Sequence, residues 1–236
     1  LIKRFRTKFK ILGFYNKNLN MKFKGVDYKY LNILEINKEK NIFSNAKIVI
    51  HTAAVVPSLF NRSNYNQANI NGTLNLAKQA SLEGVNRFIF LSSIKVYGLN
   101  FLNEKKITSD DEMCPDDNYG LSKMKAEIEL RKFSHKTKME IIIIRPALVY
   151  GPGVKGNYLL MMKLIFSGLP IPFSGIKNNR SFLAIDNLVD LIDICIIHPL
   201  AGNKTFLASD GQDISTADLV NWLGIGLVDW LEVTNL

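Results

Sequence analysis

The sequence predicts an α/β protein built on a Rossmann-type, doubly wound parallel sheet. Short apolar or β-branched runs alternate along the chain with longer segments that have helical periodicity. Several of the runs end in small or hydroxyl-bearing residues. Such alternation is typical of a parallel sheet with helices on both faces, in which ligands bind at the carboxyl ends of the strands. With 236 residues, of which 47% are apolar, the chain suits one large domain, or a domain and a small lobe.

Each predicted element is a run of one periodicity between turn signals. The strands are predicted at Lys8–Phe14, Asp27–Leu31, Lys47–His51, Arg87–Leu91 and Met139–Arg145. The helices are predicted at Ser63–Ser81, Asn118–Phe133, Tyr158–Ser167 and Ile185–Ile197. We find no internal repeat and no low-complexity linker between them.

The charge of the chain is concentrated near its start. The net charge is +9, and residues 1–40 contribute +8 of it, with 11 Lys/Arg against 3 Asp/Glu. Lys, Asn and Ile are abundant throughout, so compositional bias is the simplest explanation. No module of interleaved aromatic and basic residues accompanies the charge, and we expect no nucleic-acid partner.

The two cysteines, Cys114 and Cys195, lie far apart in the sequence. They form neither a disulfide framework nor a metal-ligand spacing, so we expect no metal site and a reducing, cytoplasmic location. The apolar runs, such as Met139–Ile144 with its Glu140, are too short or too charged for a transmembrane span.

Tyr119 and Lys123 form the most informative pair of residues. Four positions apart on a helix, they share one face. A free tyrosine has a pKa near ~10, and a neighbouring ammonium lowers it by favouring the phenolate. The pair is therefore a candidate acid/base device for interconverting an alcohol and a ketone. Upstream, a predicted strand ends at Ser92 and Ser93, whose hydroxyls could bind the same substrate oxygen.

An ordered series of motifs surrounds this pair: I-H-T-A-A, N-I-N-G-T, S-S-I-K-V-Y-G, Y-G-L-S-K, R-P-A-L-V-Y-G-P-G and R-S-F-L-A-I-D-N-L. In type, order and spacing, over about residues 30–220, it resembles the extended short-chain dehydrogenases. More narrowly, it resembles the nucleotide-sugar epimerase/dehydratase family, and within that the relatives of UDP-glucose 4-epimerase. The resemblance implies bound NAD and a UDP-sugar substrate, and it leaves a homodimer open.

By this resemblance, Tyr119 is the acid/base, and Lys123 lowers its pKa and binds the nicotinamide ribose. Ser93 binds the reacting oxygen, with Ser92 as the alternative. Other residues match family positions that contact the cofactor: Asn32 and Ile33 at the adenine, Ala53 and Ala54 beside the dinucleotide, Asn69 near the active site, and Pro146 near the nicotinamide. Asn157, at a predicted helix start, and Arg180 match positions that bind the sugar nucleotide, the latter by clamping its diphosphate.

A Rossmann domain should open with a strand, a G-x-G-x-x-G turn and a helix, and no such unit occurs near residue 1. We therefore expect Phe9–Tyr15 to be the second strand, with the first strand and its glycine turn lacking. Reading Phe9–Leu12 as the first strand is disfavoured, because one glycine and no useful helix follow. Gly151–Gly156 has the glycine pattern but lies late in the chain, where the family has a substrate-side loop.

The resulting domain prediction has two parts. Residues 1–150 form an N-terminally truncated dinucleotide-binding domain. Residues 151–236 form part of a substrate lobe that is interleaved with the last elements of the sheet. The C-terminal end also looks short for the family, so we expect truncation or a frame shift there.

The function that the resemblance implies is epimerisation at C4 of a UDP-hexose by transient oxidation. A 4-keto reductase using NAD(P)H is the alternative, and NADP is not excluded because no acidic residue stands near Tyr15–Lys17. An inactive remnant or binding protein of the same fold is a third hypothesis. A 4,6-dehydratase is disfavoured, since that group carries Asp-Glu where this chain has Ile94 and Lys95.

Overall fold

The computed structural model describes residues 1–16, 22–36, 40–56, 65–98, 106–152, 179–215 and 217–219. The chain divides into two compact units. One unit consists of Leu1–Arg145 and Val189–Leu207, and the other of Pro146–Leu188 and Ala208–Leu236.

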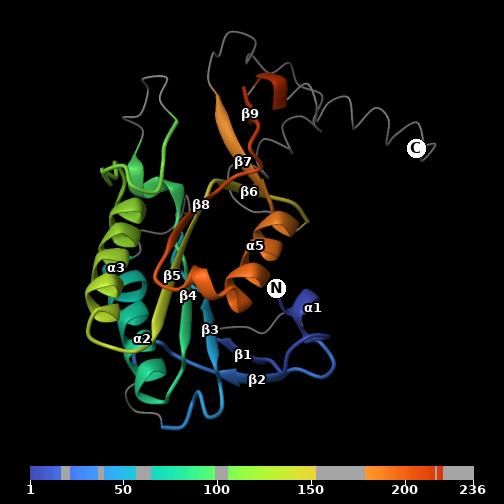
Figure 1. The fold of residues 1–236 in the computed structure, drawn as a ribbon, viewed down its shortest axis with the longest axis vertical. Helices are drawn as coiled ribbons and strands as arrows, with labels where there is room; N and C mark the ends of the chain where they lie inside the picture. The colour runs from blue at the N-terminus through green and yellow to red at the C-terminus, as the bar shows by residue number, and fades with distance from the viewer. Residues whose placement is uncertain are drawn as a thin grey trace, which may run out of the picture. The chain divides into compact units, whose positions relative to one another are not determined.

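A four-stranded sheet forms the centre of the first unit (Figure 1). It contains β3 (Ile48–His51), β4 (Arg87–Leu91), β5 (Glu140–Pro146) and β8 (Thr205–Ala208), in that order. β3, β4 and β5 are mutually parallel, as expected for strands joined by helical crossovers. The predicted α/β class and parallel sheet are confirmed.

A separate two-stranded sheet pairs β1 (Leu12–Tyr15) in parallel with β2 (Asp27–Tyr30). In the usual doubly wound order, 3-2-1-4-5-6, the first strand lies between the second and the fourth. Within the described ranges, no strand joins β1 to β3. This topology agrees with β1 and β2 holding the second and third places, as the sequence predicts for Phe9–Tyr15.

The start of that strand was predicted too early, at Lys8. A short helix, α1 (Ile2–Phe5), precedes it, and the Phe9 amide donates to the Phe5 carbonyl at 2.9 Å. Lys8 and Phe9 thus complete the turn that leaves α1. The run of alternating apolar and basic residues concealed this turn, because it satisfies both helical and strand patterns.

Helices cover both faces of the four-stranded sheet (Figure 1). α2 (Thr73–Leu82) and α3 (Asn118–Ser134) lie on one face, and α5 (Ile185–Ile197) runs along the other. The first part of the predicted helix at 63–81 is instead a π-helix, η2 (Asn66–Gly72), continuous with α2. The helix predicted at Tyr158–Ser167 lies outside the described residues.

The core is set by alternation along the buried strands. Phe88 and Phe90 of β4, with Ile141 and Ile143 of β5, face one way and join the main hydrophobic cluster. α2 and α3 supply Leu76, Ala77, Ala80, Ala126 and Leu130 to that cluster. Small alanines let the helices pack closely on the large strand residues, and this fixes α3 against the carboxyl ends of β4 and β5.

The second unit holds a three-stranded sheet of β6 (Leu148–Tyr150), β7 (Arg180–Ala184) and β9 (Asp213–Ile214). β7 is parallel to β6 and antiparallel to β9. The Asp210 carboxylate accepts hydrogen bonds from the Ala184 amide, the Asn187 side chain and the Tyr150 hydroxyl, at 2.7–3.1 Å. It therefore ties the end of β7 to β6.

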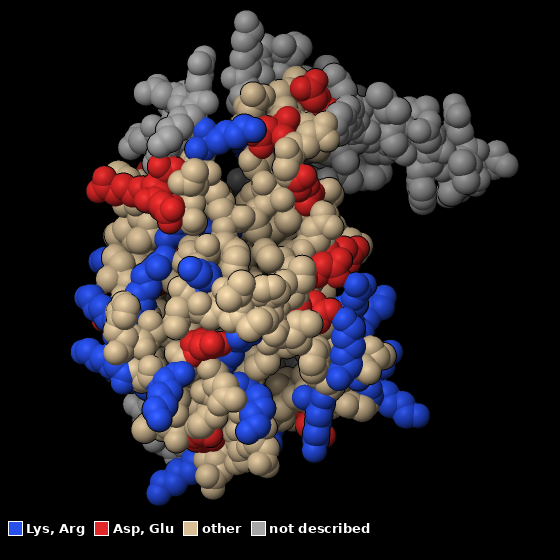
Figure 2. All heavy atoms as spheres, viewed as in Figure 1, with Lys and Arg blue, Asp and Glu red and all other residues tan. Residues whose placement is uncertain are grey.

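Basic and acidic side chains are interspersed on the face of the molecule seen in Figure 2. Part of the basic N-terminal excess is paired within the first unit, where Arg4 contacts Asp190 at 2.7 Å and Lys8 contacts Asp193. In the part of the chain that the structure describes, no helix is long and apolar enough to cross a membrane. The same residues contain no cluster of three or more His, Cys, Asp or Glu that could hold a metal.

Candidate active site

The candidate acid/base residue, Tyr119, lies in the first turn of α3. Asp117 caps this helix, and its carboxylate accepts a hydrogen bond from the Gly120 amide at 2.6 Å. An aspartate at this position satisfies one of the amides left free at a helix start. Lys123 follows one helical turn later, as the sequence predicts, on the same helix.

The Lys123 side chain is buried, at 2% exposure, near the carboxyl end of β4. Its ammonium donates to the Leu91 carbonyl at 2.7 Å and lies 4.4 Å from the centre of the Phe90 ring. Burial lowers the pKa of Lys123 to about 8, against the opposing attraction of the Glu127 carboxylate. The Leu91 carbonyl and the face of the Phe90 ring thus hold the Lys123 ammonium at the carboxyl end of β4.

The expected lowering of the Tyr119 pKa is wrong for this arrangement. Burial, followed by the repulsion of the Asp117 carboxylate, raises the pKa of Tyr119 to about 12. The Lys123 ammonium donates a hydrogen bond to the Leu91 carbonyl instead, and the Tyr65 and Tyr119 rings pack edge-to-face with centroids 6.3 Å apart. Sequence spacing predicts that two residues share a helix face but not where a long, flexible lysine puts its charge.

The two serines after β4 have different surroundings. Ser92 is buried and donates to the Glu127 carboxylate at 2.5 Å. Ser93 is partly exposed and caps the 3-10 helix η3 (Ile94–Tyr97), where its hydroxyl oxygen accepts from the Lys95 amide at 3.2 Å. Ser93 therefore remains the better candidate for binding substrate, because Ser92 is committed to an interior contact.

Asn69 joins three segments of the candidate site. Its amide accepts from the Val55 nitrogen at 2.8 Å, donates to the Val55 carbonyl at 3.0 Å, and donates to the Ser122 hydroxyl at 3.0 Å. Ser122 in turn donates to the Tyr119 carbonyl at 2.7 Å. The π-helix η2 carries this buried asparagine, and π-helical turns often occur at functional sites.

The loop that Asn69 holds follows β3 and contains Ala53, which is exposed, and Ala54, which is partly exposed. His51, at the end of β3, is buried and shares a hydrogen bond of 2.9 Å with Thr73. Burial, assisted by the positive charge of Lys123, lowers the pKa of His51 to about 3. His51 is therefore neutral and packs in the core.

Asn32 and Ile33 follow β2. The Asn32 side-chain oxygen accepts from the Leu34 amide at 3.1 Å, and this bond shapes the turn. Ile33 is partly buried against the core, and a Cβ on Gly72 would lie 2.7 Å from its Cδ1 atom. The glycine in the N-I-N-G-T motif thus lets η2 approach the turn after β2.

Two remaining predicted residues belong to the second unit. Pro146 ends β5, and Arg180 is exposed at the start of β7, where it pairs in register with Ile214. Asn157 lies outside the described residues. The structure therefore brings Ser93, Tyr119, Lys123 and Asn69 together within the first unit.

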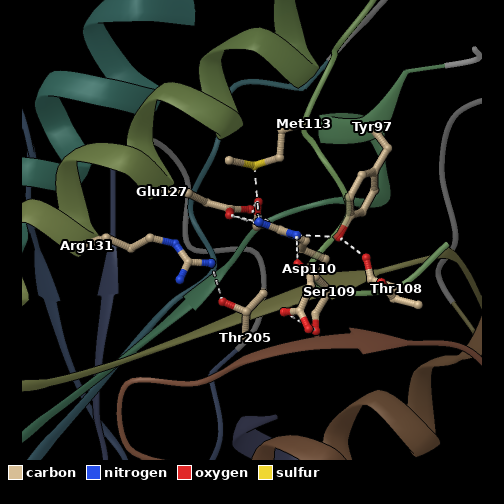
Figure 3. A network of polar contacts seen from close by, with 10 residues as sticks. Tyr97, Thr108, Ser109, Asp110, Met113, Glu127, Arg131 and Thr205 are labelled. Carbon is tan, nitrogen blue, oxygen red and sulfur yellow. Dashed lines mark hydrogen bonds and ion pairs between the residues drawn. The ribbon is translucent and has the colours of Figure 1, made fainter.

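A buried polar network beneath this site was not anticipated from the sequence. Arg145 is 1% exposed and Glu127 fully buried, and the two form an ion pair at 2.6 Å. Arg145 also donates to the Tyr97 hydroxyl, to the Ser109 carbonyl at 3.0 Å and to the Met113 sulfur at 3.1 Å. Figure 3 shows the side chains of Tyr97, Met113 and Glu127, from three segments of the chain, converging on this guanidinium.

The spacing of Glu127 from Lys123 was a usable signal for this network. Glu127 is four positions after Lys123, so it lies one turn further along the same face of α3. A charged residue on a helix face that must pack against a sheet needs a buried partner. The arginine before Pro146 was the available cation, but the sequence did not reveal that β5 places it opposite α3.

The fold and the site together define a Rossmann-like α/β protein with a Ser–Tyr–Lys set at the end of β4. The model of the NAD dependent epimerase/dehydratase family matches residues 6–208. The chain belongs to this family. It is 47% identical over 189 residues to the UDP-glucose 4-epimerase of Vibrio cholerae, covering 78% of this chain and 58% of that relative.

Solved structures show the same fold. A Thermotoga maritima UDP-glucose 4-epimerase with UDP-glucose superposes with a TM-score of 0.79 at 21% identity, covering 94% of this chain and 75% of that one. The Bordetella bronchiseptica enzyme WbmG, in complex with NAD and UDP, gives a TM-score of 0.78 at 21% identity, covering 94% and 72% of the two chains. The chain spans 58%, 51% and 47% of the length of three curated relatives that it matches.

Proposed function

We propose that the protein containing this chain is an NAD-dependent epimerase that inverts C4 of a UDP-hexose. The supporting observation is the grouping of Ser93, Tyr119 and Lys123 at the carboxyl end of β4, held by Asn69. The Vibrio cholerae relative, at 47% identity, is named for this activity, and solved relatives contain NAD with UDP or UDP-glucuronic acid.

Several features of the first unit fit a dinucleotide. Ala53 and Ala54 leave room beside the end of β3, and Asn69 fixes their loop through both backbone groups of Val55. Asn32 keeps its amide nitrogen for an adenine ring, since its oxygen is used by Leu34. When bound, NAD would accept and return the hydride of C4. Pro146 would lie near the nicotinamide.

Tyr119 would remove the proton of the sugar's 4-hydroxyl and later return it to the same oxygen, when C4 receives its hydride on the opposite face. Its high pKa makes the phenolate rare, so catalysis requires a nearby cation. Lys123 can supply that charge by moving from the Leu91 carbonyl toward the phenol and a ribose hydroxyl. Ser93, whose hydroxyl hydrogen is not used in its contact with Lys95, would donate to the C4 oxygen.

The second unit would hold the sugar nucleotide. Arg180 is exposed and can bind a diphosphate through two parallel hydrogen bonds. By the resemblance, Asn157 would also bind the sugar nucleotide. The same set of residues would serve a UDP-4-keto-sugar reductase, and Asn16, an uncharged residue directly after β1, leaves NADP acceptable.

The test uses the protein that contains this chain, with NAD and UDP-glucose deuterated at C4. An epimerase gives UDP-galactose that keeps the deuterium, because the same hydride returns. A reductase gives no interconversion under these conditions but consumes NAD(P)H when a UDP-4-keto-sugar is added. Absence of both reactions would contradict the proposal and favour an inactive member of the family.

A further inference from the structure

Lys95 contacts both segments that carry candidate catalytic residues, the turn with Ser93 and the helix with Tyr119. It lies in η3, directly after the serines that end β4. Its amide donates to the Ser93 hydroxyl at 3.2 Å, and its ammonium pairs with the Asp117 carboxylate at 2.5 Å. Asp117 caps α3 two residues before Tyr119. One residue therefore bridges the turn that carries Ser93 and the helix that carries Tyr119.

The backbone of Lys95 also approaches α3. A Cβ built on Gly120 would lie 2.3 Å from the Lys95 carbonyl oxygen, closer than any side chain allows. Gly120 directly follows Tyr119, so α3 approaches η3 only because this position has no side chain. A Cβ built on Gly98, whose φ is +72°, would likewise lie 2.3 Å from the Cys114 carbonyl oxygen. The segment that leads into α3 therefore packs closely against η3 and the glycine that follows it.

The ion pair also bears on the charge around Tyr119. Partial burial raises the pKa of Asp117, but the Gly120 hydrogen bond and the contacts with Lys95 outweigh it, so the pKa lies below its usual value. The Asp117 carboxylate is therefore ionised, and it opposes formation of a phenolate at Tyr119. Tyr65, from the segment before η2, packs on the ring, and Lys123 lies one turn along α3.

We infer that Lys95 is a positioning residue of the active site. It holds the Asp117 cap in place and neutralises its charge, so that the hydroxyls of Ser93 and Tyr119 can both hydrogen-bond to one substrate oxygen. The inference rests on the proposed function. A partly exposed ion pair alone adds little to stability. The expected effect is instead on proton transfer, because an unneutralised carboxylate near Tyr119 makes its phenolate rarer.

The experiment compares Lys95→Met, Lys95→Arg, Asp117→Asn and the double variant Lys95→Met/Asp117→Asn. Lys95→Met should lower kcat about 3- to 10-fold with little change in KM, and shift the acidic limb of the kcat profile upward by about half to one pH unit. Lys95→Arg should retain wild-type behaviour. Asparagine still caps a helix, so Asp117→Asn should cancel the shift caused by Lys95→Met.

A direct reading of the phenol separates this inference from the proposed function. Fluorotyrosine labelling, with the resonance assigned through Tyr119→Phe, reports ionisation of Tyr119 by 19F NMR without turnover. A higher midpoint in Lys95→Met, restored in the double variant, supports the inference. An unchanged midpoint in Lys95→Met, or a pH shift that Asp117→Asn leaves in place, overturns it. Wild-type turnover by Tyr119→Phe would instead overturn the proposed function.

Discussion

Glu127 and Arg145 form an ion pair at 2.6 Å in which neither side chain is more than 2% exposed. Breaking such a pair leaves one charge buried without its partner, at a cost of about 3–5 kcal/mol. We expect Arg145→Met to lower the free energy of unfolding by this amount, measured by urea denaturation. Arg145→Met/Glu127→Leu should lose less than the two single variants combined, because neither charge is left unpaired.

The control for this prediction is the exposed pair of Lys132 and Glu129, also separated by 2.6 Å. Exposed pairs contribute about 0–1 kcal/mol, so Lys132→Met should be nearly neutral. If Arg145→Met cost no more than Lys132→Met, the buried network would have no structural importance.

Tyr119→Phe should reduce kcat by about 10²- to 10⁴-fold, the usual contribution of a general acid/base group. The hydroxyl moves protons, whereas the ring packs against Tyr65 and is retained in phenylalanine. NAD affinity, measured by calorimetry, should therefore remain close to that of the unaltered protein. A variant that turned over normally would remove Tyr119 from the mechanism.

His51 should make the protein less stable in mild acid. Its pKa is lowered to about 3 in the folded chain, while an unfolded histidine has a pKa near ~6.5. Between these values the unfolded chain binds one more proton. Stability contributed by neutral His51 is therefore present above pH ~6.5 and falls by about 1.4 kcal/mol for each pH unit below it.

The measurement is the free energy of unfolding between pH 6.5 and 4.5 for wild type, His51→Gln and His135→Gln. Glutamine cannot take up the proton, so His51→Gln should show a shallower decline by about the stated amount. His135 is exposed at the end of α3, and its replacement should leave the slope unchanged. Equal slopes for all three proteins would mean that His51 is protonated in the folded state.

Arg180→Ala should weaken UDP binding by about 1.5–3 kcal/mol, the range for a hydrogen bond to a charged group. NAD affinity should not change, because Arg180 is not among the proposed dinucleotide contacts. Arg180→Lys keeps the charge but loses the bidentate geometry, so its affinity for UDP should lie between those of the wild type and Arg180→Ala. Calorimetry with UDP that gave one affinity for all three would exclude Arg180 from the diphosphate site.

Much of the architecture could be predicted from local pattern. The apolar runs at Ile48–His51 and Arg87–Leu91, with the helical pattern from Asn118, were enough for a parallel α/β sheet and for Tyr119 and Lys123 on one helix. These features depend on side-chain periodicity, which is written directly in the sequence. The boundary at Lys8 failed where helical and strand periodicities overlap.

The sequence by itself determined the family motifs, the class of fold and the residue types of the candidate site. Only the tertiary structure decided which polar groups were already engaged: Lys123 with the Leu91 carbonyl, Ser92 with Glu127, and Lys95 with Asp117. The physical reason is that burial and charge act through space. The pKa of Tyr119 depends on neighbours that β4, η3 and α3 bring together, and no spacing along the chain specifies where those neighbours direct their charges.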